Sequence, residues 1–130
     1  ALYDPLTGLP NQNYLLGRIR QCIQSRQQKN SLFAVLCLSL DGFKAVKYGL
    51  GHALSDRLLI EVARRLESYT HPTDIVARCG TDEFAILLAD LPNFKHAENK
   101  AEQLREALRT QFKLNGSVVS SNIYIGIVNS

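Results

Sequence analysis

One stretch decides the fold of this 130-residue chain: residues 74–88, with the sequence DIVARCGTDEFAILL. The apolar and β-branched residues within Asp74–Cys79 and Glu83–Leu88 predict two strands. Gly80 and Thr81 between them predict a tight turn, so the stretch forms a β-hairpin. The remaining elements are placed relative to this hairpin.

Apolar residues outside the hairpin recur with helical or extended spacing, and Gly, Pro and Asn separate the segments. Before the hairpin we predict a helix over residues 11–28 and a strand Leu32–Leu40 that is buried on both faces. A short helical turn from Phe43, a break at Gly49 and Gly51, and a long helix that ends at Pro72 follow. After the hairpin we predict a helix from about Lys95 to Phe112 and a strand Val118–Val128.

Without the first helix, the order is strand, helix, strand, strand, helix, strand, which is typical of ferredoxin-like folds. A right-handed crossover leaves room for the third strand between the first two, antiparallel to both. The fold class is therefore α/β (α+β), with a mainly antiparallel central sheet flanked by helices. The end of the first strand meets the hairpin tip, which places Ser39 and Asp41 close to Asp82 and Glu83. These oxygen ligands predict a cation site beside helix starts that suit phosphate.

Composition limits the class of protein. With 45% hydrophobic and 21% charged residues, the chain fits a single globular domain over residues 1–130. The longest apolar run, residues 32–38, is far shorter than the roughly 20 residues of a membrane span, so no membrane contact is expected from this segment. The net charge of +3 is concentrated on the first helix without interleaved aromatic residues, so no nucleic-acid partner is expected.

The cysteines indicate the compartment. Cys22, Cys37 and Cys79 fit neither a metal-binding spacing nor a disulfide framework. We expect reduced thiols that fill the core of a cytoplasmic protein, or of the cytoplasmic portion of a larger one. The absence of methionine, even at position 1, indicates a piece of a longer protein.

Four motifs carry a resemblance to a known family. They are DPLTGLPN at residues 4–11, LDGFK at residues 40–44, Gly51-His52 with Asp56, and ARCGTDEF at residues 77–84. In this order and spacing they resemble the GGDEF family of diguanylate cyclases over almost the whole chain. The resemblance implies a palm-like nucleotide cyclase fold that binds GTP, pairs with a second copy as a homodimer and joins two GTP molecules into cyclic di-GMP.

The end of the chain is similar to GGDEF domains that precede an EAL phosphodiesterase domain. The similarity lies in FKLNG at residues 112–116, followed by IGI at residues 125–127. An EAL or sensory domain is therefore the expected covalent neighbour. The family's last helix, which carries further basic phosphate ligands, is absent from residues 1–130, so the domain is expected to be truncated before it.

The resemblance also implies Mg²⁺ or Mn²⁺ whenever nucleotide is bound. Asp82 is the retained metal carboxylate, and Glu83 beside it is the other candidate catalytic residue. Ser39 stands where the family has an aspartate, and a neutral hydroxyl cannot replace an anionic magnesium ligand. The backbone carbonyl of Leu40 remains a candidate ligand. One of two metal carboxylates is therefore lost.

The implied nucleotide site is altered as well. Lys47 replaces an asparagine, and lysine offers guanine no hydrogen-bond acceptor. Thr81 replaces the second signature glycine where nucleotide approaches closely. Backbone amides of residues 40–44 suit phosphate, and Lys44 adds charge. The candidate nucleotide-binding residues are Phe43, Lys44, Lys47, Asp56, Gly80 and Thr81.

The family's product-inhibition motif, RxxD, has a degenerate counterpart in residues 71–74. Asp74 matches, but His71 replaces the arginine whose planar fork grips base or phosphate. Cyclic di-GMP is therefore not expected at this inhibitory site.

Plainer interpretations stay open for single residues. Asp41 is a common type of helix cap, Asp82 and Glu83 fit an ordinary hairpin, and Lys47 fits a solvated surface. For the whole chain we expect a degenerate GGDEF domain of cyclic di-GMP signalling, catalytically inactive and regulatory, with weak GTP binding. The alternative is an active diguanylate cyclase in which water, Ser39 and Asp82 hold enough metal. A third is a structural spacer without nucleotide affinity.

Overall fold

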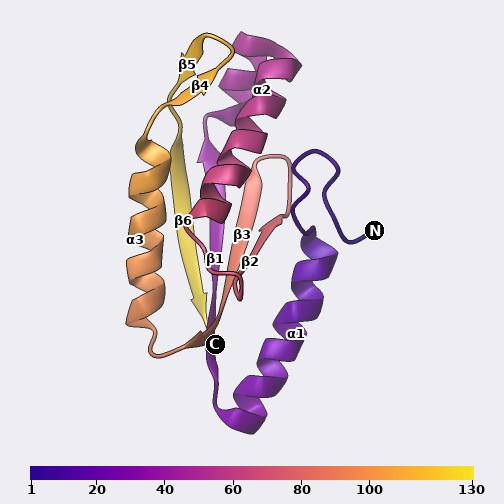
Figure 1. The fold of residues 1–130 in the computed structure, drawn as a ribbon, viewed down its shortest axis with the longest axis vertical. Coiled ribbons are helices and arrows are strands. Elements are labelled where there is room, and N and C mark those ends of the chain that lie inside the picture. Colours follow the sequence, from indigo (N-terminus) through magenta and orange to yellow (C-terminus); the bar gives the residue numbers. More distant parts are fainter.

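The computed structural model describes all residues 1–130 and has a four-stranded antiparallel sheet at its centre (Figure 1). The strands lie in the order β2-β3-β1-β6, so β3 lies between β2 and β1, as the ferredoxin-like arrangement predicts. Their bounds are β1 Leu32–Asp41, β2 Ile75–Arg78, β3 Glu83–Leu91 and β6 Asn122–Asn129. The predicted fold class and the predicted hairpin are confirmed.

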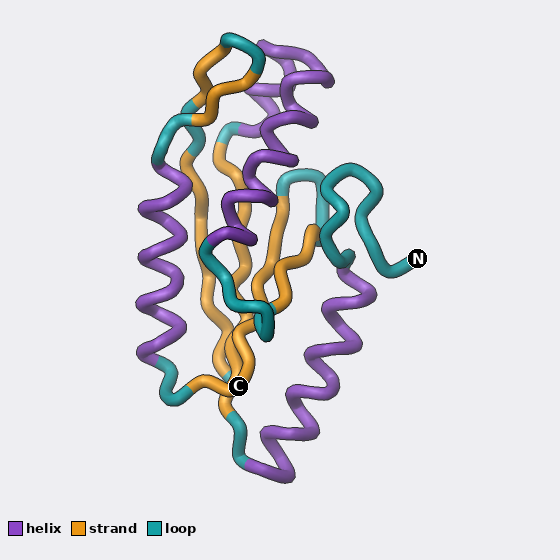
Figure 2. The backbone as a smooth tube through the Cα atoms, in the orientation of Figure 1, coloured by secondary structure: helices purple, strands orange, loops and turns teal.

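Three helices flank this sheet: α1 (Gln12–Lys29), α2 (Phe43–Ser68) and α3 (Lys95–Arg109). α2 and α3 cover one face and α1 lies on the other, as Figure 2 shows. Because side chains alternate along a strand, β1 contributes to both sides. On the side of α2 and α3, β1 contributes four residues to the main core of 23 buried residues: Ala34, Leu36, Leu38 and Leu40.

The long helix α2 is kinked at Gly51, where φ is 85° and ψ is 175°. Only glycine adopts this backbone conformation readily, which confirms the predicted break. α2 begins at Phe43 after Gly42, and no side chain caps this start. The capping role considered for Asp41 is therefore wrong.

The C-terminal third differs from the prediction. α3 ends at Arg109 rather than near Phe112, and Phe112 is buried in a small second sheet of β4 (Phe112–Leu114) and β5 (Ser117–Val119). Asn115 and Gly116 form the turn between these strands, with φ values of 49° and 88°. The predicted single strand Val118–Val128 is wrong, because β5 ends at Val119 and β6 begins at Asn122.

The face of β1 toward α1 is only partly covered. Phe33 is buried against α1, whereas Cys37 is exposed and Ser39 is half-buried. The expectations that β1 is buried on both faces and that Cys37 fills the core are therefore wrong. Cys79 is half-buried, and burial, with smaller effects of Cys37 and Glu83, raises the pKa of its thiol. None of the three helices has both the length and the apolar composition to span a membrane.

Candidate functional site

The candidate site is centred on the turn between β2 and β3. The amides of Cys79 and Gly80 donate to the carbonyl oxygen of Glu83 at 2.8 and 3.3 Å, which closes the turn. The amide of Leu40 donates to the carbonyl oxygen of Asp82 at 3.1 Å. This bond joins the end of β1 to the hairpin tip, as the topology predicts.

A cavity of about 330 Å³ lies between this turn and the start of α2. Two lysines and two carboxylates meet there, which suits a ligand that carries both phosphates and a cation. Other surface cavities are about as large, so this cavity is distinguished by its charges rather than by its volume. Its lining residues are Phe43, Lys44, Lys47, Tyr48, Thr81, Asp82 and Glu83.

Several predicted residues lie outside this cavity wall. Asp56 is exposed beyond the kink of α2 and is not among the lining residues. Gly80 packs against Glu83 instead: a Cβ on Gly80 would lie 3.0 Å from Oε1 of Glu83. Thr81 does line the cavity, and its φ lies outside the left-handed region, so the turn accepts a β-branched residue without strain.

The predicted cation site is only partly formed. Ser39 is the direct cross-strand partner of Glu83, so these two are adjacent as expected. However, no group of three or more His, Cys, Asp or Glu side chains is placed to hold a metal ion, so Asp41 does not complete a cluster with Asp82 and Glu83. Mg²⁺ commonly takes one or two carboxylates together with substrate phosphates. The donors present therefore fit a metal ion that arrives with a nucleotide, and they do not fit a permanent protein cage.

The two predicted inhibitory-site residues lie in one turn before β2. The carboxylate of Asp74 accepts the amide of His71 at 3.0 Å, and the amide of Asp74 donates to the carbonyl of His71 at 2.9 Å. Asp74 thus has a local structural partner, and the imidazole of His71 is exposed.

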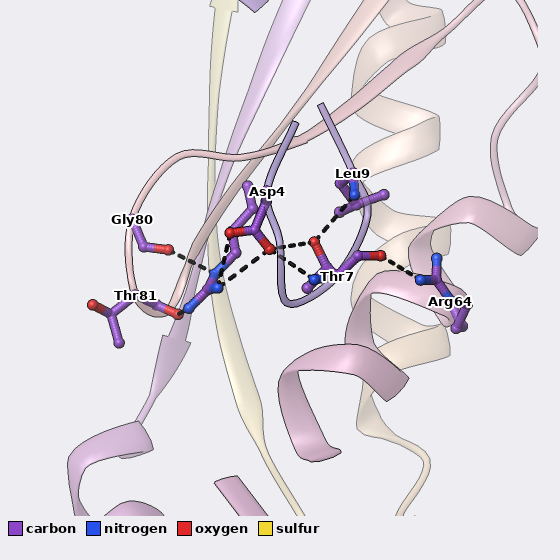
Figure 3. Close-up of polar contacts among 7 residues, drawn as sticks. Asp4, Thr7, Leu9, Arg64, Gly80 and Thr81 are labelled. Carbon is purple, nitrogen blue, oxygen red and sulfur yellow. Dashed lines mark hydrogen bonds and ion pairs between the residues drawn. The ribbon is translucent and has the colours of Figure 1, made fainter. Parts of the chain in front are cut away.

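The sequence analysis missed the residue that organises the hairpin turn, Arg78. Its guanidinium donates to Asp4 and to the carbonyl groups of Gly80 and Thr81; these three acceptor residues are labelled in Figure 3. Nη1 of Arg78 lies 3.1 Å from Oδ1 of Asp4, and both side chains are about 15% exposed. Both residues belong to motifs that resemble the family, but nothing in their spacing indicates that they meet.

Asp4 is held as a carboxylate. Burial raises its pKa, but hydrogen bonds from the amide and hydroxyl of Thr7 and the positive charge of Arg78 outweigh burial. The pKa of this carboxyl therefore lies below its ordinary value.

Comparison with known proteins adds independent information. The family model for the diguanylate cyclase GGDEF domain matches residues 1–130. Among curated proteins, the bifunctional diguanylate cyclase/cyclic di-GMP phosphodiesterase MucR of Pseudomonas aeruginosa is 41% identical over 127 residues, covering 98% of the chain and 18% of MucR. The diguanylate cyclase TpbB of the same species is 36% identical over 128 residues, covering 98% of the chain and 29% of TpbB. The chain therefore spans less than a third of either relative.

The solved structures agree. The GGDEF domain of TpbB superposes with a TM-score of 0.94 at 35% identity, covering 98% of this chain and 74% of that structure. A sensory box/GGDEF family protein from Caulobacter crescentus gives a TM-score of 0.93 at 32% identity, covering 99% of this chain and 83% of that structure. Fold, sequence and hairpin geometry point the same way: the chain belongs to the GGDEF domain family.

Proposed function

We propose that this GGDEF domain binds GTP weakly, does not synthesise cyclic di-GMP and acts as a regulatory module of cyclic di-GMP signalling. The observation that carries the proposal is the pairing of Ser39 with Glu83 at the hairpin. The family resemblance implies a second metal carboxylate at position 39, where this chain has a hydroxyl, and no group of three or more His, Cys, Asp or Glu side chains is placed to hold a metal ion instead.

The chemistry explains why one carboxylate matters. Cyclic di-GMP synthesis needs the 3′-hydroxyl of one GTP to attack the α-phosphate of another, and divalent cations would neutralise the charge that develops there. In this chain Asp82, with the carbonyl of Leu40, would hold such an ion. With Ser39 in place of an anion, we expect too little negative charge to retain the metal ions in the transition state.

Binding of the phosphates is better supported than recognition of the base. Lys44 and Lys47 both line the cavity opposite the turn, and Lys44 suits the phosphates of GTP. Lys47 cannot accept hydrogen bonds from guanine, and Asp56 lies outside the cavity wall. We therefore propose weak affinity with little preference for guanine over adenine.

The expected partners follow from the same residues. His71 stands where the family's inhibitory motif has an arginine and lacks the planar fork that grips base or phosphate, so we propose that cyclic di-GMP does not bind at this turn. An EAL or sensory domain as covalent neighbour and a second copy of the domain are proposed from the resemblance and from relatives such as MucR. A cytoplasmic location fits three cysteines that form no disulfide.

The test is chromatography of nucleotides after the purified protein is incubated with GTP and Mg²⁺ or Mn²⁺, at concentrations that favour dimers. We expect GTP to be recovered intact. In parallel, GTP at about 100 times its dissociation constant should stabilise the fold by about 2.7 kcal/mol, or raise Tm by roughly 10 °C. A variant with Ser39→Asp, Lys47→Asn and Thr81→Gly should bind GTP more tightly and serves as the matched comparison.

The outcomes separate the three functions. Catalytic appearance of cyclic di-GMP would establish the alternative, an active cyclase in which Asp82 and Glu83 suffice. Intact GTP with thermal stabilisation would support the proposal. Intact GTP without thermal stabilisation of the protein would support the third function, a structural spacer without nucleotide affinity.

A further inference from the structure

Arg78 is the last residue of β2, and its side chain contacts Asp4 and the hairpin-turn residues Gly80 and Thr81, which Figure 3 labels. Nη1 contacts Oδ1 and Oδ2 of Asp4 at 3.1 and 3.3 Å. Nε donates to the carbonyl oxygen of Gly80 at 3.1 Å, and Nη2 donates to that of Thr81 at 2.8 Å. Because a guanidinium is planar with donors in a fixed fork, the two carbonyl groups are held in a fixed relation to the Asp4 carboxylate.

Asp4 is itself held by the N-terminal loop, residues 2–11. Its Oδ2 accepts the amide and the hydroxyl of Thr7 at 2.8 and 2.7 Å. Its amide donates to the carbonyl of Leu9 at 2.7 Å. The backbone of Arg78 joins the same loop, because its amide donates to the carbonyl of Pro10 at 2.9 Å. The loop, Arg78 and the turn are therefore one hydrogen-bonded unit.

The orientation of the two carbonyl groups has a consequence for the cavity. In a trans peptide the C=O and the following N–H point in opposite directions. With the carbonyls of Gly80 and Thr81 turned toward Arg78, the amides of Thr81 and Asp82 point away from it. Neither amide donates to another backbone group, and both residues line the cavity. Unpaired amides of this kind are suitable donors to a phosphate.

We propose that Arg78 is the positioning residue of this cavity, and that through Asp4 it couples the N-terminal loop to nucleotide affinity. The inference rests on the proposed GTP binding. When the loop is displaced, the Asp4 carboxylate moves and the guanidinium of Arg78 moves with it. The carbonyl groups that Arg78 holds then change orientation, so the amides of Thr81 and Asp82 no longer point toward the phosphate. A segment that precedes residue 4 thus acts on the cavity without touching it.

Two variants and one matched control test this coupling. Asp4→Asn removes the charge that holds Arg78, and Arg78→Lys keeps the charge but removes the fork. Arg65→Gln is the control, because Arg65 donates to the carbonyl groups of Ala107, Thr110 and Gln111 and so joins α2 to the end of α3, away from the N-terminal loop and the turn. GTP affinity is measured by calorimetry at a temperature where all proteins are folded. Amide exchange of Leu40, whose acceptor is the carbonyl of Asp82, is followed by NMR.

We expect both test variants to bind GTP about tenfold more weakly and to exchange the Leu40 amide faster, as loss of a charge-assisted hydrogen bond implies. Arg65→Gln should lower Tm yet leave both readouts unchanged. GTP affinity that survives Asp4→Asn and Arg78→Lys would overturn the positioning role alone, as would equal weakening in Arg65→Gln. No binding by the unchanged protein would refute the proposed function and, with it, the role of Arg78.

Discussion

Replacing Ser39 by aspartate gives a direct measure of the electrostatics at the candidate metal site. Ser39 and Glu83 are direct partners in the β1–β3 ladder and line the same groove beside α1. Directly opposed residues have Cβ atoms about 5 Å apart. Two unit charges at this distance repel by about 1 kcal/mol in water and by about 3 kcal/mol at an effective dielectric constant of 20.

Because Glu83 is exposed and Ser39 is half-buried, we expect the lower end of this range, a loss of about 1 kcal/mol of unfolding free energy for Ser39→Asp. For a chain of 130 residues this corresponds to a fall in Tm of roughly 4 °C. The assay is thermal unfolding followed by circular dichroism, in EDTA and in millimolar Mg²⁺ or Mn²⁺. The metal should restore most of the loss in the variant and should leave the unchanged protein unaffected.

Ser39→Asn is the matched control, because asparagine has the size of aspartate without its charge. It should show neither the metal dependence nor the recovery that aspartate shows near pH 4, where carboxylates become protonated. If Ser39→Asp and Ser39→Asn unfold identically in EDTA and in metal, then residue 39 does not face the carboxylates. In that case the account of the lost metal ligand is wrong.

Two further predictions concern stability. The pKa of Asp4 is depressed in the fold, so its contribution to stability is present above the ordinary pKa of an aspartate and is lost as pH falls through the lower folded value. Urea titrations between about pH 2 and pH 6 should show that the unchanged protein loses unfolding free energy as the pH falls, and that Asp4→Asn loses less. Parallel curves of unfolding free energy against pH for the two proteins would contradict this prediction. Gly51 has a φ of 85° whereas Gly49 lies in helix with open space around its Cα. Gly51→Ala should therefore lower the unfolding free energy by about 1–2 kcal/mol, whereas Gly49→Ala should leave it unchanged or raise it by up to about 1 kcal/mol. Equal urea midpoints for the two variants would contradict this prediction.

The sequence predicts the sheet well because its signals are local. The apolar run of β1, the turn residues Gly80 and Thr81, and the handedness of crossovers together lead to the observed strand order. The same local signal misled at the C-terminus. Asn115-Gly116 is a hairpin signal, and it closes a separate small sheet instead of starting β6.

The candidate site was predicted only where strand register controls it. Ser39 meets Glu83 because both follow from the β1–β3 pairing. The contact between Asp4 and Arg78 joins residues 74 positions apart, and it depends on the path of a loop that no periodicity describes. Exposure of Cys37 was missed for a related reason: an apolar run does not reveal how far along a strand a covering helix extends.

The central position of β1 also has a consequence for how the domain is made. β1 pairs on one side with β6 from Ala34–Asn129 to Asp41–Asn122, so one of its two edges stays unpaired until residues 122–129 have been synthesised. Such non-local pairing is slow to form, and an apolar strand with an open edge is prone to aggregate. During synthesis this strand should therefore be most prone to aggregate in the interval before β6 has emerged from the ribosome.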